Sequence, residues 1–90
     1  MRVLRYEVPV DGEWHTHRLS GEVLHVAAPA ADVIEFWALE SGGPLIERAF
    51  RVFGTGEELA IADSRYVGTG IWPASSVPSR LVWHLYTEGP

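Results

Sequence analysis

The chain has 90 residues, of which 47% are hydrophobic and 11% aromatic, so it is long enough for one hydrophobic core and predicts a single domain over residues 1–90. It contains no cysteine, which excludes a disulfide framework, cysteine-based zinc sites and thiol catalysis. A formal net charge of −5 argues against a nucleic-acid binder, because the basic footprint of that class is missing.

The first ten residues carry two arginines and a glutamate and hold no continuous apolar stretch that would act as a signal or membrane segment. We therefore expect a soluble, cytoplasmic protein that makes no contact with a membrane.

Turn signals divide the chain into seven strand-like runs that are rich in Val, Ile, Trp, Tyr and Phe. Short runs of this kind between Gly- and Pro-bearing turns predict an all-β fold, an antiparallel meander of six or seven strands that forms a small barrel or a two-layer roll. The runs are Arg2 to Val10, Glu13 to Leu19, Glu22 to Ala28, Val33 to Glu40, Leu45 to Phe53, Tyr66 to Trp72 and Leu81 to Tyr86.

Two tight turns link the first three runs. Asp11-Gly12 is typical of a two-residue type I′ hairpin, which would place Tyr6 opposite His17. Ser20-Gly21 would close a second hairpin with Leu24 opposite His17. Both registers predict the same apolar face, formed by Leu4, Tyr6, Val8, Leu19, Leu24 and Val26, and a solvated face formed by Arg5, Glu7, Trp14, Thr16, Arg18 and His25.

The fourth run is apolar on both sides, with Ile34, Phe36 and Ala38 on one face and Val33, Trp37 and Leu39 on the other. A strand of this kind is either central with both of its faces covered by other parts of the protein, or it presents one face to a partner. In the sixth run, Gly68 and Gly70 alternate on one face, which indicates a bend or room for a neighbouring aromatic ring.

Several runs together resemble a family of short proteins from actinobacteria and their bacteriophages, known as a domain of unknown function. The most particular of them is Phe50-Arg51-Val52-Phe53-Gly54-Thr55-Gly56, and the likeness covers nearly the whole chain. The resemblance implies a bacterial or prophage origin and a free-standing domain, and it brings no catalytic or binding residues.

His15-Thr16-His17 is the sharpest candidate for a metal site, because two histidines one residue apart on a strand point the same way. With Glu22 on the same face, the set resembles the first metal motif of the cupin barrels, in which two His and a Glu hold a metal. The rest of that pattern is missing around Pro78 and His84, so we expect no metal and no cofactor. The alternative is a cupin-like metal-dependent barrel that uses His15, His17 and Glu22.

His25 and His84 each stand alone among apolar residues, where a hydrogen-bonded structural role is the usual one. The sequence holds no nucleophile elbow, P-loop or dinucleotide fingerprint. We therefore expect no enzyme activity.

Trp37, Arg51 and Phe53 are predicted to share the face opposite Phe36 and Phe50, and these are residue types enriched at the centres of protein interfaces. The alternative is that this face is the second half of a closed core, with Arg51 at its rim. We expect a non-enzymatic binding or protein-interaction module, an accessory or assembly protein of phage origin, whose partner is another protein or a second copy.

Overall fold

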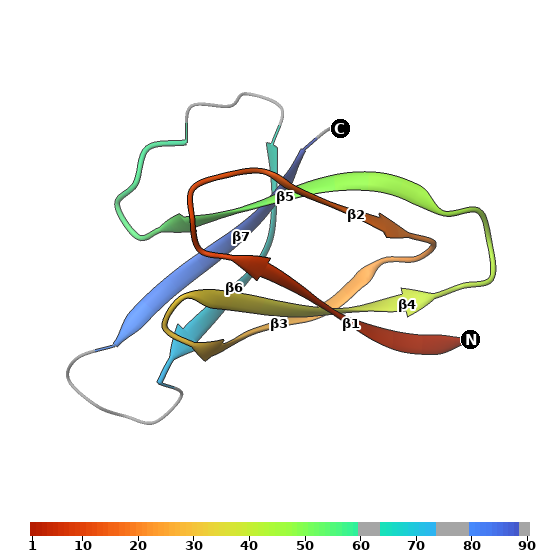
Figure 1. Cartoon of the computed structure of the whole chain (residues 1–90), viewed down its shortest axis with the longest axis horizontal. Helices are drawn as coiled ribbons and strands as arrows, with labels where there is room; N and C mark the ends of the chain where they lie inside the picture. Colours follow the sequence, from red (N-terminus) through yellow and green to blue (C-terminus); the bar gives the residue numbers. More distant parts are fainter. Residues whose placement is uncertain (60–63, 74–79, 89–90) are drawn as a thin grey trace.

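The computed structural model describes residues 1–59, 64–73 and 80–88, and these form seven β-strands in two antiparallel sheets (Figure 1). The all-β, two-layer prediction is confirmed; the layers form a sandwich, and the sheets do not join into a closed barrel. None of the described residues belongs to a helix with the length and apolarity that crossing a membrane requires. The strands are β1 (Arg2–Pro9), β2 (His15–Leu19), β3 (Val23–Ala30), β4 (Val33–Glu40), β5 (Ile46–Gly54), β6 (Ser64–Trp72) and β7 (Leu81–Glu88).

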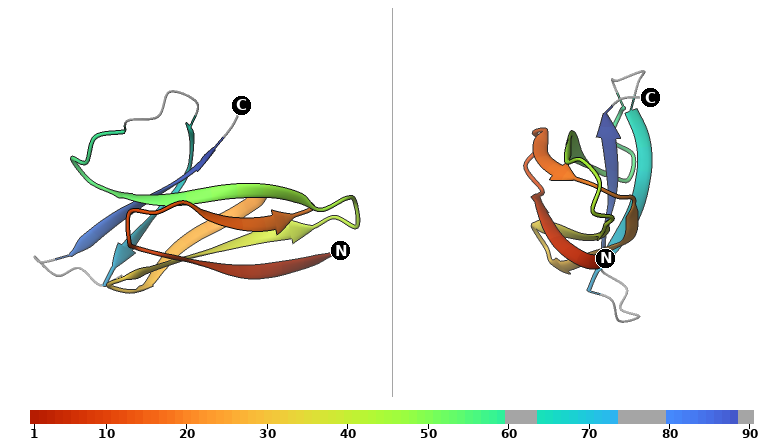
Figure 2. Two further views of the ribbon diagram at one scale, coloured as in Figure 1. Left: turned by 45° about the horizontal axis from the view of Figure 1, so that its top comes forward. Right: turned by 90° about the vertical axis from the view of Figure 1, so that its right-hand side faces the viewer.

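The strand order departs from a simple meander. One sheet has the order β1-β4-β3 and the other β2-β5-β7-β6, so only β3–β4 and β6–β7 pair with their neighbours in sequence. The strands of the two sheets cross at an angle: β7 of the larger sheet runs diagonally in Figure 1, whereas β4 of the smaller sheet runs nearly horizontally, and Figure 2 shows the two layers from other sides.

The two predicted hairpins at the start of the chain are wrong. Gly12 has the positive φ that was expected, at 75°, but Asp11 does not, and a type I′ turn needs both. The connection from Val10 to Trp14 instead carries the chain from one sheet to the other, and the Ser20-Gly21 turn carries it back. Strand β1 pairs with β4 in place of β2, and β3 also pairs with β4.

As the central strand of its sheet, β4 pairs along both edges, and its inner side chains Ile34, Phe36 and Ala38 are buried between the sheets; this burial outweighs the local turn signal. Apart from Leu24, the residues of the predicted apolar face still point into the protein, although the strands pair differently. Tyr6 and His17 point toward each other across the sandwich, with ring centroids 5.4 Å apart, although they are not cross-strand neighbours.

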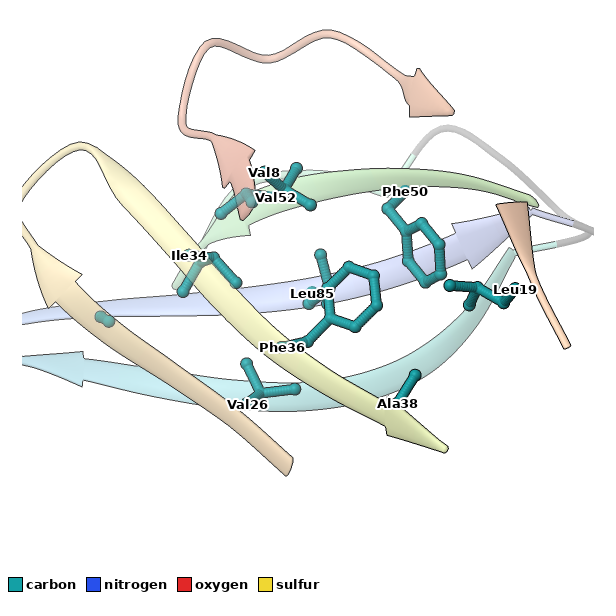
Figure 3. Close-up of a cluster of buried hydrophobic side chains, with 10 residues drawn as sticks. Val8, Leu19, Val26, Ile34, Phe36, Ala38, Phe50, Val52 and Leu85 are labelled. Atoms are coloured by element: carbon teal, nitrogen blue, oxygen red, sulfur yellow. The ribbon is translucent and has the colours of Figure 1, made fainter. Parts of the chain in front are cut away.

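The core lies between the sheets and is built on Phe36 of β4 and Phe50 of β5, whose ring centroids are 4.6 Å apart (Figure 3). Ile34, Phe36 and Ala38 are buried, as the alternation in the fourth run predicts. The complete cluster consists of Val8, Leu19, Val26, Ala28, Ile34, Phe36, Ala38, Phe50, Val52 and Leu85.

Leu24 is the one residue of the predicted apolar face that is largely exposed, at 49% of its surface. The pairing of β3 with β4 moves from Val23 opposite Ala38 to His25 opposite Trp37, so Leu24 is an extra residue in a β-bulge. The extra residue reverses the alternation, which is why Val23 and Val26 both pack on the core although their sequence parity differs.

Strands β3 and β6 close one side of the sandwich by direct packing of their backbones. A Cβ atom on Gly70 would lie 2.8 Å from the backbone of Ala27 and Ala28, and one on Gly68 would lie 2.5 Å from Cγ2 of Val26. The two glycines thus leave room for a neighbour, as predicted, but the neighbour is strand β3 and not an aromatic ring.

Candidate functional site

Trp37 lies on the outer face of the β1-β4-β3 sheet. It is half-buried in the central strand, opposite Arg5 of β1 on one side and His25 of β3 on the other. Its ring centroid is 5.6 Å from that of His25. Val3, which is 54% exposed, pairs with Leu39 on the same side of the sheet. We call Val3, Trp37 and Leu39 the Trp37 face.

The ion pairs of Arg5 border the Trp37 face. The Arg2–Glu40 pair lies at one end of β1 and β4, in the inward-facing alternation; Arg2 bonds the carboxylate through two nitrogens, at 2.8 and 3.0 Å, which holds the pKa of Glu40 below its ordinary value. Arg5 pairs closely with Glu35 and lies 3.4 Å from Glu7. An apolar centre inside a charged rim is the usual anatomy of a protein interface.

Arg51 and Phe53 lie on the opposite side of the molecule, on the outer face of the larger sheet. The prediction that they share a face with Trp37 is therefore wrong, because the connection between β4 and β5 crosses from one sheet to the other. The Arg51 guanidinium sits 4.6 Å from the centroid of the Phe53 ring. Phe53 is only 2% exposed, so it is not accessible to a partner in this conformation.

A small pocket of about 150 Å³ beside Phe53 is lined by the segment that follows β5 and by Tyr86 and His84 of β7. Tyr86 packs edge-on against Phe53 and against Tyr66, at centroid distances of 5.5 and 5.7 Å. This cluster of rings was not expected from the sequence, because it depends on β7 lying between β5 and β6 in the sheet.

His84 is held at both ring nitrogens by threonine hydroxyls. Nδ1 lies 3.0 Å from Oγ1 of Thr69 and Nε2 lies 2.9 Å from Oγ1 of Thr55, and Thr69 also bonds the Tyr66 hydroxyl at 2.6 Å. The two threonines are the central residues of the two Gly-Thr-Gly tripeptides, 54–56 and 68–70. The sequence analysis did not predict this network; the repeated tripeptide is the feature of the sequence that could have indicated it. The hydrogen-bonded role expected for His84 is confirmed.

His15 and His17 point to the same side of β2, as predicted, but their ring nitrogens have separate partners. Nε2 of His15 lies 2.9 Å from both carboxylate oxygens of Asp11, which holds the pKa of Asp11 below its ordinary value. Nε2 of His17 donates to the backbone carbonyl of Glu7 at 2.9 Å. Glu22 lines a different cleft, next to Arg48 and Arg65.

Over residues 1–59, 64–73 and 80–88, no three His, Asp or Glu side chains are arranged to hold a metal ion. His15, His17 and Glu22 therefore do not converge on one point in this fold.

Comparison with known proteins places the whole chain, residues 1–90, in one family, and the protein belongs to the domain of unknown function DUF7352. No curated protein and no solved structure matches the chain. The resemblance to a domain family without an assigned function is thus confirmed.

Proposed function

We propose that this domain is a non-enzymatic protein-interaction module, and that its contact surface is the Trp37 face. The observation that carries the proposal is the outer side of the β1-β4-β3 sheet, where the apolar side chains of Trp37, Leu39 and Val3 meet without a covering element among the described residues. Exposed apolar side chains that gather on one face and are rimmed by polar residues often mark an interaction surface.

The rim supports a second copy of the chain as the first partner to test. The chain as a whole repels its own copies, since its formal net charge is −5. On the outer side of this sheet the charges are mixed, with Arg5 beside Glu7 and Glu35. A two-fold arrangement in which Arg5 of one copy lies opposite Glu7 or Glu35 of the other would make the contact complementary in charge.

A non-enzymatic role is favoured because the histidine side chains best placed for chemistry are already engaged within the fold. Both nitrogens of His84 contact threonine hydroxyls, and His15 and His17 bond Asp11 and a backbone carbonyl. The resemblance to short proteins of actinobacteria and their phages suggests an accessory or assembly component, and the genes beside the coding sequence would test that setting.

The test is the mass of the protein in solution, measured by light scattering over a range of concentrations. We expect a dimer that Val3→Asp dissociates, because the new carboxylate must be buried in the contact. Leu45→Asp is the matched control: Leu45 is exposed to the same degree, 53% against 54%, but lies outside the Trp37 face, so the dimer should persist.

Trp37→Ala serves as the second variant and should weaken association by about 2 kcal/mol or more if Trp37 is central to the contact. A melting temperature near that of the wild type separates this effect from unfolding. A wild-type protein that stays monomeric at millimolar concentration would overturn self-association. A Trp37→Ala variant that unfolds would show that Trp37 belongs to the core.

A further inference from the structure

Two arginines converge in a cleft at the open end of the sandwich. The cleft has a volume of about 360 Å³ and lies between the β2–β3 connection and strands β5 and β6. Arg48 of β5 and Arg65 of β6 line it, Glu22 stands at its border, and Thr87 of β7 contributes a wall that is almost fully buried.

The sheet register explains why both arginines point into this cleft. Arg65 pairs with Thr87, which pairs with Phe50, so these three side chains form one inward-facing row across β6, β7 and β5. Arg48 lies two residues before Phe50 and so shares its inward direction. The Arg48 guanidinium lies 5.3 Å from the centroid of the buried Phe50 ring, a contact that helps to hold the Arg48 side chain in place.

Neither guanidinium has an ion pair with any residue in the described part of the chain. Arg2, Arg5 and Arg51 by contrast each have a glutamate partner. Burial, and second the positive charge of Arg65, hold the pKa of Arg48 below its ordinary value. Two cations thus face one cleft in a chain whose net charge is −5, and Glu22 at its border is not within ion-pair distance of either of them.

We propose that this cleft binds a phosphomonoester. Two guanidinium groups supply planar forks of N–H donors that match phosphate oxygens in pairs, and two positive charges match an anion of charge near −2 better than a single carboxylate. The volume lies within the range of small-molecule sites, about 300–1,000 Å³. The cleft opens at the end of the sandwich and not on the Trp37 face, so the inference does not rest on the proposed interaction.

The experiment follows backbone amide signals by NMR while inorganic phosphate is added to the intact chain. We expect saturable shifts in the residues that line the cleft, with acetate binding at least about tenfold more weakly because it carries one charge. Arg48→Ala and Arg65→Ala should each weaken phosphate binding about tenfold or more. Arg18→Ala is the matched control, since Arg18 is an exposed arginine on β2 outside the cleft, and it should leave the affinity within twofold.

Glu22→Gln removes the carboxylate at the border of the cleft and should tighten phosphate binding. If the two arginines had only a structural role, this substitution would not change the affinity for phosphate. A phosphoserine peptide added in place of phosphate shows whether the bound phosphate group belongs to a protein or to a free small molecule. Tighter binding of the peptide assigns the cleft to a phosphorylated protein, and equal binding assigns it to a free phosphorylated molecule. The proposal is overturned if neither ligand shifts the cleft residues at millimolar concentration, or if Arg18→Ala weakens binding as much as Arg48→Ala.

Discussion

Gly70→Ala tests the close approach of β3 and β6, on which the closure of the sandwich depends. The added methyl group would lie 2.8 Å from the carbonyl carbon of Ala27, from the amide nitrogen of Ala28 and from Cδ1 of Ile34. Carbon atoms in contact are normally about 3.5–4.0 Å apart, so one of the strands must shift. Two of the three atoms belong to the β3 backbone, which cannot rotate out of the way as a side chain can.

The expected cost follows from two opposing effects. Overpacking a tight core costs about 1–3 kcal/mol, and the rigid neighbour places Gly70→Ala near the upper end of that range. Replacing glycine by alanine also restricts the unfolded chain, which returns about 0.4–1 kcal/mol. The net loss is about 2 kcal/mol of unfolding free energy, and at about 4–8 °C per kcal/mol the melting temperature falls by about 8–16 °C.

Urea denaturation followed by tryptophan fluorescence measures the change. Gly43→Ala is the matched control: the nearest atom to its new methyl group, Oγ of Ser41, lies at an ordinary distance of 3.4 Å, and Gly43 has no positive φ. That variant should be as stable as the wild type or slightly more so. If Gly70→Ala is equally stable, the backbones of β3 and β6 do not approach as described.

Two further measurements test the core and the turn after β1. Phe36→Ala should cost about 3–5 kcal/mol of unfolding free energy, because it removes a fully buried ring; a loss below about 1 kcal/mol would contradict its central place. The pKa of Asp11 should lie below its ordinary value of 3.8 in an NMR titration and should rise in His15→Gln, which removes the main hydrogen bond to the carboxylate. Because the folded-state pKa is the lower one, this contact stabilises the fold above about pH 4 and is lost as the pH falls through the folded value; an unchanged pKa in the variant would refute the contact.

The alternation of apolar and polar residues determined much of this fold without reference to tertiary structure. The fourth run was predicted with the bounds that the strand has, Val33 to Glu40, and its inward residues Ile34, Phe36 and Ala38 are buried. Val8, Leu19 and Val26 also face inward as expected. This information is local, because a strand turns successive side chains to opposite faces whatever strand lies beside it.

The choice of neighbours was decided only by the tertiary structure. A turn such as Asp11-Gly12 favours a hairpin by a small local free energy, whereas pairing β1 with β4 buries the inner faces of both sheets against each other. The turn signal therefore does not decide the strand pairing, and Trp37 and Arg51 lie on opposite sides of the molecule. The bulge that exposes Leu24 depends in the same way on the strand paired with it.

The two candidate sites show the same division. The sequence predicted the apolar outer side of β4, because this one run has apolar residues at both odd and even positions. The cleft of Arg48 and Arg65 was not, because the two residues lie on β5 and β6, which do not pair with each other, and only the order β5-β7-β6 brings them to one end of the sandwich. Charges that meet across strands depend on register, and register is settled by the packing of the whole core.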